Sequence, residues 1–246
     1  MGSVIPLKKS VNSAYLDLKN ILNDRLDSVE KLIRLKLKSD VELIKEMSDH
    51  HLDSGGKRIR ALLTMGAAKL GGYNQGSRDV NLAACVELIH SATLLHDDVI
   101  DESKLRRGAK TTNSIWGNHS SVLVGDYLLS RCFEMMVEDG NLEILKLLSS
   151  TSSKIAQGEV LQLTYKGEAD LLEENYIKII SLKTAALFSA ATRVGACIAG
   201  LEKKKKEALE SYGKNIGLAF QIADDALDYF SKEKIFGKEI GKDFFF

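Results

Sequence analysis

Proline is almost absent from this chain, and this absence constrains the fold more than any other feature of the sequence. The only proline among 246 residues is Pro6, so residues 7–246 lack the residue type that breaks helices most strongly. Apolar and charged residues recur at helical spacing over most of this length, and no segment alternates as a strand does. The sequence therefore predicts an all-α protein built from long helices.

The expected helices are separated by glycine-bearing or polar breaks, and no linker divides the chain, so residues 1–246 are predicted to form a single domain. Residues 102–118 are expected to form a loop with a helical turn inside it. The predicted helices occupy about residues 8–37, 40–52, 57–70, 78–101, 119–138, 141–165, 173–199 and 203–231.

The bulk composition excludes several classes of protein. Lysine plus arginine equals aspartate plus glutamate at 34 each, so no net field attracts nucleic acid or an anionic membrane. Cys85, Cys132 and Cys197 lie far apart in apolar helical contexts, which predicts reduced core thiols and neither a disulfide framework nor a zinc site. No apolar run is long enough for a membrane span, and the N-terminus lacks the apolar core of a signal peptide. We therefore expect a cytoplasmic protein.

An acidic motif interrupts the apolar pattern of residues 87–107, ELIHSATLLHDDVIDESKLRR. Asp97, Asp98 and Asp101 end the apolar run, and helical spacing places His90, Asp97 and Asp101 on one face. Like charges one turn apart destabilise a helix, and carboxylates in a buried pattern need a compensating cation. Magnesium suits this role because it takes oxygen ligands and usually joins one or two carboxylates to substrate phosphates.

A second acidic motif repeats this design in residues 217–230, GLAFQIADDALDYF. Asp224, Asp225 and Asp228 interrupt an apolar helical pattern, and Gln221 lies one turn earlier. A solvated helix end would explain either motif alone. Two such motifs in apolar contexts instead predict facing carboxylate clusters that share metal ions across a cavity.

Basic residues follow a glycine pair in residues 55–60, GGKRIR, where a helix is expected to begin. Free N–H groups and the helix dipole favour anions at such a position, and the spacing of Lys57 and Arg60 would point both side chains the same way. This segment alone is more often structural than functional, and it lacks the spacing of a nucleotide P-loop.

Two further cationic positions accompany the acidic motifs. Arg106 and Arg107 directly follow the first motif and are a second candidate for binding phosphate. Lys183 lies in the apolar segment ISLKTAALFSAA, where it either reaches the surface or faces a polar cavity.

A di-iron site is the competing chemistry, because Glu87 and His90 form one E-x-x-H pair. Such a site needs a second pair and two more helix glutamates. No other histidine has a glutamate three residues before it, so the di-iron interpretation fails; these histidines are His50, His51, His96 and His119.

These motifs, in this order and approximate spacing, resemble those of the trans-isoprenyl diphosphate synthases, also called polyprenyl synthetases. The resemblance rests on GGKRIR, ELIHSATLLHDDVIDESKLRRG, the pair Lys183-Thr184, FQIADDALDY and GKEIGKD. It covers about residues 45–243, and ATLLHDDVIDES, SVLVGDYLL and GEVLQL are most similar to the bacterial octaprenyl diphosphate synthases. The resemblance implies a single all-α bundle around a deep central cavity, and a homodimer.

The resemblance also implies a role for each motif in joining isopentenyl diphosphate to an allylic diphosphate. The aspartates would hold magnesium against the allylic diphosphate, and Thr184 and Gln221 would stabilise the developing carbocation. The implied magnesium ligands are Asp97, Asp101 and Asp224, supported by Asp98, Asp225 and Asp228. The implied ligands of the allylic diphosphate are Arg106, Lys183 and Lys238, and those of isopentenyl diphosphate are Lys57, Arg60, His90 and Arg107.

Product length would depend on how far the hydrocarbon can extend below the aspartates. Ala92 and Thr93 lie about 6–8 Å back along the helix from Asp97, where bulky aromatic residues in the family give short products. Their small size predicts a long product, octaprenyl-like and suited to a quinone side chain. Phe133 is a guess for a deeper floor. Packing against a neighbouring helix is the alternative for all three residues and is favoured for Phe133.

The resemblance has two departures. Ala61 stands where a proline often follows the basic motif, and the sequence ends at Phe246 where family members continue through several more helices. We therefore expect a bundle that is truncated at its C-terminus. Two alternatives to a synthase stay open: a non-catalytic partner subunit of a heteromeric enzyme, and a terpene cyclase, which would not need Lys57, Arg60 and Arg107.

Overall fold

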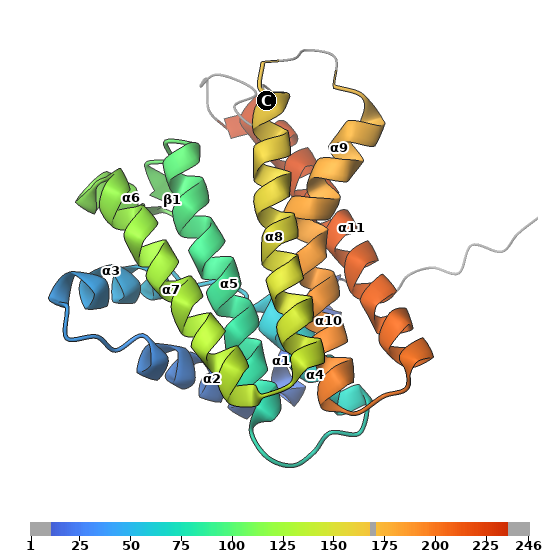
Figure 1. Ribbon diagram of the computed structural model, residues 1–246. Coiled ribbons are helices and arrows are strands. Elements are labelled where there is room, and N and C mark those ends of the chain that lie inside the picture. The colour runs from blue at the N-terminus through green and yellow to red at the C-terminus, as the bar shows by residue number, and fades with distance from the viewer. Residues whose placement is uncertain (1–10, 168–170, 236–246) are drawn as a thin grey trace, which may run out of the picture.

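Helices make up most of the described part of the protein in this computed structural model (Figure 1). The structure describes residues 11–167 and 171–235 and, outside that gap, the side chains of residues 14–228. The predicted all-α class is confirmed. The helices are α1 (Val11–Ile21), α2 (Asn23–Lys36), α3 (Glu42–Asp53), α4 (Ile59–Leu70), α5 (Arg78–Ile100), α6 (Thr112–Trp116), α7 (Asn118–Asp139), α8 (Leu142–Thr164), α9 (Glu173–Ile180), α10 (Ala186–Ile198) and α11 (Lys203–Ile235), with a π-helical turn, η1 (Ser181–Ala185), between α9 and α10.

The single opening helix predicted for residues 8–37 is wrong, because the chain breaks at Leu22 into α1 and α2. Leu22 has φ −116° and ψ 11°, outside the helical range, and its side chain is buried. Leu22 and Leu18 both lie against Gly66 of α4, where the missing side chain leaves room for them. Packing on α4 therefore overrides a helical pattern that continues through the break.

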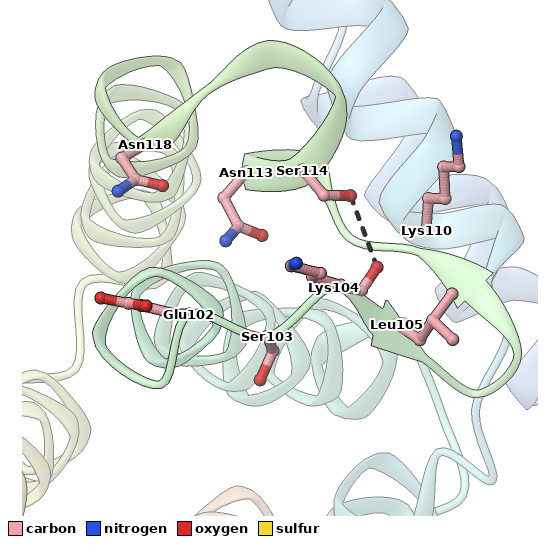
Figure 2. A pocket seen from close by; sticks show the side chains of 8 residues that line it. All are labelled: Glu102, Ser103, Lys104, Leu105, Lys110, Asn113, Ser114 and Asn118. Carbon is pink, nitrogen blue, oxygen red and sulfur yellow. Dashed lines mark hydrogen bonds between the residues drawn. The ribbon is translucent and has the colours of Figure 1, made fainter.

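The loop predicted at residues 102–118 contains a β-hairpin that the sequence pattern did not indicate. Strands β1 (Leu105–Arg106) and β2 (Ala109–Lys110) pair antiparallel, and the two residues between them both have positive φ, as a type I′ turn requires. Two-residue strands are too short to produce a visible alternation. Figure 2 shows this hairpin beside α6, with the Ser114 hydroxyl donating to the Lys104 carbonyl at 3.4 Å.

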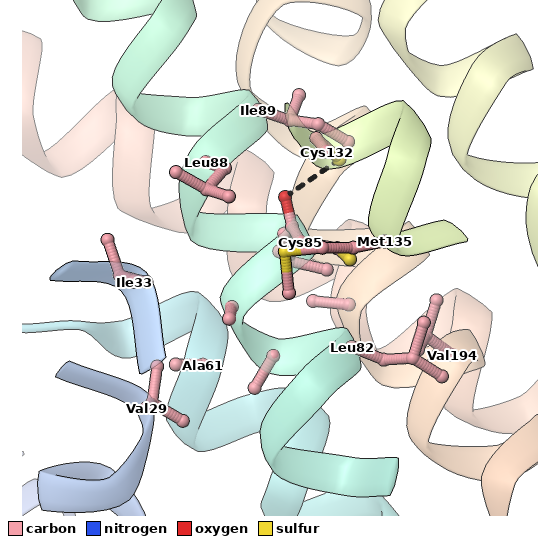
Figure 3. Packing of buried hydrophobic residues seen from close by; sticks show 14 of the residues in the cluster. Val29, Ile33, Ala61, Leu82, Cys85, Leu88, Ile89, Cys132, Met135 and Val194 are labelled. Atoms are coloured by element: carbon pink, nitrogen blue, oxygen red, sulfur yellow. Dashed lines mark hydrogen bonds between the residues drawn. The ribbon is translucent and has the colours of Figure 1, made fainter. Parts of the chain in front are cut away.

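Helix α5 is the centre of the fold and is buried on almost every side of its first four turns. It packs against α2, α4, α7 and α10, and Figure 3 shows apolar side chains from these helices gathered around it. The Cys132 thiol donates to the Cys85 carbonyl at 3.4 Å, which joins α7 to α5. Because α5 ends in the first acidic motif, the position of this motif is fixed by the core.

Two groups of helices meet through α4 and α10. In Figure 1, α5 and α7 lie together on one side, and α8, α10 and α11 lie together on the other. Helix α4 contacts both α5 and α10, so it ties the groups together. The first acidic motif ends α5 in one group, and the second lies on α11 in the other.

Two predictions from composition are tested by the fold. Cys85, Cys132 and Cys197 are buried free thiols, as predicted. Within the described ranges, no helix combines the length and apolar character that crossing a bilayer requires.

Candidate active site

A lysine from η1 lies among the carboxylates at the end of α5, and we call Asp97, Asp101, Glu159 and Lys183 the acidic centre. The Lys183 ammonium is 2.6 Å from Glu159 Oε1 and donates to Gln162 Oε1 at 3.1 Å. Both partners come from α8. Helices α5 and α8 and the π-helical turn thus converge at this point.

Electrostatics show that the acidic centre carries more negative charge than Lys183 neutralises. Burial raises the pKa of Asp97 to about 7, and the neighbouring Glu159 and Asp101 add to this rise although Lys183 opposes it. Burial lowers the pKa of Lys183, but Asp97, Glu159 and Asp101 outweigh this effect and raise it. One ammonium therefore serves three carboxylates.

The π-helical turn explains how Lys183 reaches this position. A π-helical turn inside a helix inserts one extra residue and often marks a functional site. Here it lies so close to α8 that a Cβ atom at Gly158 would come within 2.8 Å of the Lys183 backbone nitrogen. Glycine at this position therefore permits α8 to place Glu159 and Gln162 beside the ammonium.

The residue after Lys183 connects the same turn to the second acidic motif. The buried Thr184 hydroxyl donates to Gln221 Oε1 at 2.7 Å, and Gln221 Nε2 donates to Asp225 Oδ1 at 2.8 Å. The Tyr176 hydroxyl donates to the other Asp225 oxygen at 2.6 Å. Consecutive residues of η1 therefore bond to groups beside the first and second motifs, so the two motifs lie on either side of this turn.

The donor set fits a hard divalent cation. Asp97, Asp101 and Asp224 supply oxygen ligands, and Asp101 and Asp224 are exposed at the ends of the two motifs. Among the described side chains, no three His, Cys, Asp or Glu residues are arranged to hold a metal ion. Magnesium usually binds through one or two carboxylates, waters and substrate phosphates instead of an all-protein cage. Burial and the neighbouring carboxylates raise the pKa of Asp97, and a bound cation would oppose both effects.

Asp98 differs from its neighbours because it faces away from the acidic centre into the core. It is 2% exposed and accepts from Arg106 Nε at 3.0 Å and Arg106 Nη2 at 2.8 Å. This bidentate geometry is among the strongest hydrogen-bonded ion pairs in proteins. Asp98 thus binds Arg106, a predicted diphosphate ligand, and its role in supporting the metal ligands stays a prediction.

Four arginines and two histidines from four elements meet on the other side of Asp98, and we call them the basic centre: His51, Arg58, Arg60, His90, Arg106 and Arg107. Burial lowers the pKa of Arg60 to about 10, and Arg107 adds to this effect although Glu87 opposes it. Burial also lowers the pKa of His51 to about 3, and that of His90 far below its usual value, with the neighbouring arginines contributing to both. Both imidazoles are therefore neutral at pH 7.

Two arginines of the basic centre are available to an anion. The Arg60 guanidinium lies 4.4 Å from the centroid of the Phe188 ring, and its buried Nε has no partner among the described residues. Arg107, at the tip of the hairpin, donates to the Gly55 carbonyl. A Cβ atom at Gly56 would lie 2.8 Å from Arg107 Nη1, so the glycine pair makes room for this side chain.

The prediction that helical spacing points the Lys57 and Arg60 side chains the same way is wrong, although Arg60 belongs to the basic centre. Helix α4 begins at Ile59, and Arg58 before it is left-handed with φ 48°. Lys57 is therefore outside the helix and exposed. The Ala61 N–H in the first turn of α4 is also not free to bind an anion, because it donates to Glu87 Oε1 at 3.0 Å. Lys238, the remaining predicted cation, lies outside the described residues.

Five residues of the site were missed from the sequence: Glu159, Gln162 and Tyr176 near the acidic motifs, and His51 and Arg58 at the basic centre. The first two belong to GEVLQL, which supported the resemblance but received no role. A glutamate and a glutamine three apart on an amphipathic helix share a face, and this spacing could have indicated them. Nothing in the local pattern indicates Tyr176.

The predicted chain-length residues lie in different environments. Ala92 is 2% exposed in the core face of α5, and the half-buried Thr93 donates its hydroxyl to the His90 carbonyl at 2.8 Å. Phe133, on α7, is 39% exposed. Phe133 is therefore not part of the buried core.

A surface pocket of about 530 Å³ lies beyond the end of α5 (Figure 2). It contains none of the predicted site residues; its lining is Glu102, Ser103, Lys104, Leu105, Lys110, Asn113, Ser114 and Asn118. The candidate site is instead defined by the acidic and basic centres.

Comparison with known proteins identifies the family of this chain. The family profile "Polyprenyl synthetase" matches residues 41–245. The octaprenyl diphosphate synthase of Escherichia coli (strain K12) is 45% identical over 215 residues, which are 87% of this chain and 66% of that protein. The chain therefore spans just under two thirds of the length of this relative.

Solved structures share the fold. A decaprenyl diphosphate synthase from Rhodobacter capsulatus superimposes with a TM-score of 0.88 at 48% identity, covering 94% of this chain and 71% of that one. A polyprenyl synthase from Caulobacter crescentus CB15, complexed with calcium and isoprenyl diphosphate, superimposes with a TM-score of 0.87 at 47% identity, covering 94% and 70%. Other similar proteins are named nonaprenyl, heptaprenyl and geranylgeranyl diphosphate synthases, so the named product length varies.

Proposed function

The chain belongs to the polyprenyl synthetase family, and from this premise we propose that it joins isopentenyl diphosphate to an allylic diphosphate. The product is a long-chain all-trans polyprenyl diphosphate. The observation that carries this proposal is the pair Lys183-Thr184, which contacts groups beside both acidic motifs from one π-helical turn. An acidic centre beside a separate basic centre provides for two diphosphates at once.

In the proposed reaction, the acidic centre binds the allylic substrate. Asp97, Asp101 and Asp224 would hold Mg²⁺, and Lys183 and Lys238, together with Arg106 where the two centres meet, would bind its diphosphate. Bound Mg²⁺ supplies Lewis-acid stabilisation of the negative charge on the leaving diphosphate. The allylic C–O bond breaks as this charge develops, and Lys183 is positioned by α8 to stabilise it.

The basic centre binds isopentenyl diphosphate in this proposal through Lys57, Arg60, His90 and Arg107. His90 is neutral at pH 7, so it donates one N–H to the diphosphate without adding charge. The double bond of isopentenyl diphosphate attacks the allylic cation, and a proton then leaves, with the released diphosphate as its acceptor. The Thr184 hydroxyl and the Gln221 side-chain carbonyl, which are hydrogen-bonded to each other, are assigned to stabilise the developing cation.

We assign an octaprenyl-like product from the small residues Ala92 and Thr93 and from the identity to the Escherichia coli synthase. A precursor of a quinone side chain made in the cytoplasm is the corresponding biological role. Ala92→Phe should shorten the product, because a phenyl ring would fill the space beside the hydrocarbon about one helical turn below Asp97. An unchanged product distribution would remove Ala92 from the chain-length determinants.

A homodimer is the expected assembly, since α7 exposes several large apolar side chains. Val122, Leu123, Phe133 and Val137 are exposed by 38%, 68%, 39% and 67%. Leu123→Glu should shift the protein from dimer to monomer in light scattering after size exclusion, because a carboxylate would be desolvated in the interface. A wild-type monomer at micromolar concentration would contradict the assembly.

The direct test of activity is incubation with farnesyl diphosphate, labelled isopentenyl diphosphate and Mg²⁺, followed by product chromatography. We expect chain extension that EDTA abolishes and added Mg²⁺ restores. A heteromeric role is the second candidate, because a relative from Bacillus subtilis at 35% identity is named "Heptaprenyl diphosphate synthase component 2". Extension only after a second polypeptide is added would favour that role.

A further inference from the structure

A buried carboxylate that the proposed reaction does not use lies among the residues of the basic centre. Glu87 of α5 is 2% exposed, and its Oε1 accepts the Ala61 N–H at 3.0 Å. Its Oε2 lies 3.5 Å from Arg58 Nη1. Glu87 therefore holds the backbone at the start of α4 and the side chain that precedes it.

A negative charge at this place opposes the binding of an anion. Glu87 acts electrostatically on Arg60 and Arg107, the two arginines that are available to a diphosphate. By charge alone, a glutamine at this position would strengthen anion binding. A carboxylate here needs another physical explanation.

The explanation lies in the conformation of residues 57–61. Arg58 has a left-handed backbone, which a non-glycine residue adopts only at an energetic cost. Its guanidinium is tied to Glu30 of α2 as well as to Glu87. The carboxylates of Glu30 and Glu87, from two different helices, thus hold the Arg58 side chain in place. Glu87 also holds the first turn of α4, from which Arg60 projects.

We propose that Glu87 is a positioning residue for the diphosphate site of the basic centre. It orders residues 57–61 so that Arg60 faces the same anion as Arg107. This inference rests on the proposed function for the identity of the anion, a diphosphate ester. The charge of Glu87 weakens the attraction for the anion. The ordering of residues 57–61 by Glu87 strengthens anion binding by more than this loss.

The test measures binding of inorganic pyrophosphate by calorimetry in EDTA, where the acidic centre lacks a metal to bind it. Glu87→Gln keeps an acceptor for the Ala61 N–H but places an amide against Arg58. Glu87→Asp keeps the charge but is one methylene too short to reach both partners. We expect each to weaken pyrophosphate binding by on the order of tenfold, as loss of a ligand-orienting partner does.

Asp139→Asn is the matched control. Asp139 is a buried carboxylate that pairs with Arg78 of α5 at 2.6 and 2.9 Å, at the opposite end of that helix. Its loss should lower the free energy of unfolding without changing pyrophosphate affinity. Circular dichroism should show wild-type helix content for both Glu87 variants.

Steady-state kinetics separates positioning from a general structural effect. Both Glu87 variants should raise KM for isopentenyl diphosphate by about the same factor, with KM for the allylic substrate changed less than about twofold. Binding by Glu87→Gln that equals or exceeds the wild type would overturn the inference. So would wild-type affinity in Glu87→Asp, or no pyrophosphate binding by the wild-type protein.

The two proposals fail in different ways. If Glu87→Gln loses pyrophosphate affinity but the wild-type protein extends no primer, the inference stands and the proposed function falls. If the wild-type protein extends the primer and Glu87→Gln keeps its KM for isopentenyl diphosphate, the proposed function stands and the inference falls.

Discussion

The acidic and basic centres are electrostatic opposites held by the same helix. At the acidic centre, burial and neighbouring carboxylates raise the pKa of Asp97 to about 7. At the basic centre, burial and neighbouring cations lower the pKa of His51 to about 3 and that of Arg60 to about 10. Each centre holds an excess of one sign of charge in the free protein.

This difference indicates what each centre binds. Cations would offset the negative charge of the acidic centre, and an anion would offset the positive charge of the basic centre. A diphosphate with bound metal ions at the first centre and a second diphosphate at the other would supply these charges. The two centres meet at the ion pair between Asp98, from the first acidic motif, and Arg106, from the basic centre. Substitutions on either side of this pair therefore test whether the two centres act as one site.

The largest expected effect comes from removing a charge from the acidic centre. Asp97→Asn and Asp224→Asn should each lower the rate of chain extension by at least about a hundredfold, because charge stabilisation in the transition state is lost. Helix content by circular dichroism should stay unchanged. Asp126→Asn, which removes an exposed carboxylate on α7, is the control and should retain wild-type turnover.

The next effect is on stability. Asp98→Ala should lower the free energy of unfolding by about 3 kcal/mol, because it leaves Arg106 without its buried partner among like charges. Asp225→Ala should cost about 1 kcal/mol, because its partners Tyr176 and Gln221 are neutral and closer to solvent. Urea unfolding in EDTA measures both losses of unfolding free energy. Equal losses would mean that Asp98 and Asp225 contribute equally to stability and would contradict this comparison.

The two centres should also give opposite pH dependences without metal. Between about pH 3 and pH 6.5, unfolded His51 binds a proton that the folded residue does not, so stability falls as the pH falls. Between pH 3.8 and about 7, folded Asp97 keeps a proton that the unfolded chain releases, so stability falls as the pH rises.

Single variants isolate these slopes from other titrating groups. His51→Gln should flatten the acidic slope and Asp97→Asn the opposite one, each measured as the difference from wild type in urea unfolding across the pH range. A His51→Gln difference that does not change between pH 4 and pH 7 would show that the imidazole titrates normally in the folded protein.

The smallest expected effect concerns the second motif. Tyr176→Phe removes one hydrogen bond to Asp225 and should cost about 1 kcal/mol or less in unfolding free energy. Turnover should fall only a few-fold, since Gln221 still holds the other oxygen of Asp225. A loss as large as that of Asp224→Asn would give Asp225 a direct role.

The helices could be predicted from sequence because their signals are local. Scarce proline and long apolar periodicity gave the positions of most helices to within a few residues. The break at Leu22 was missed because its cause is packing on Gly66 of α4, far along the chain. The left-handed Arg58 was missed because Glu30 and Glu87 hold it from other helices.

The candidate site was predictable where identical motifs repeat and unpredictable where a role depends on a neighbour. Two D-D-x-x-D segments indicated paired carboxylate clusters without any structural information. Glu159 gave a much weaker signal, its spacing from Gln162, because a glutamate on an amphipathic helix is usually solvated. Its role becomes visible only when the π-helical turn brings Lys183 within 2.6 Å of it.

The most direct test of the account is a crystal structure of the protein with Mg²⁺ and a non-reactive allylic diphosphate analogue. The account predicts ions that join Asp97 and Asp101, at the end of α5, and Asp224, on α11, to one diphosphate, with Lys183 contacting the same group. A diphosphate bound without either motif, or ions on one motif alone, would contradict it.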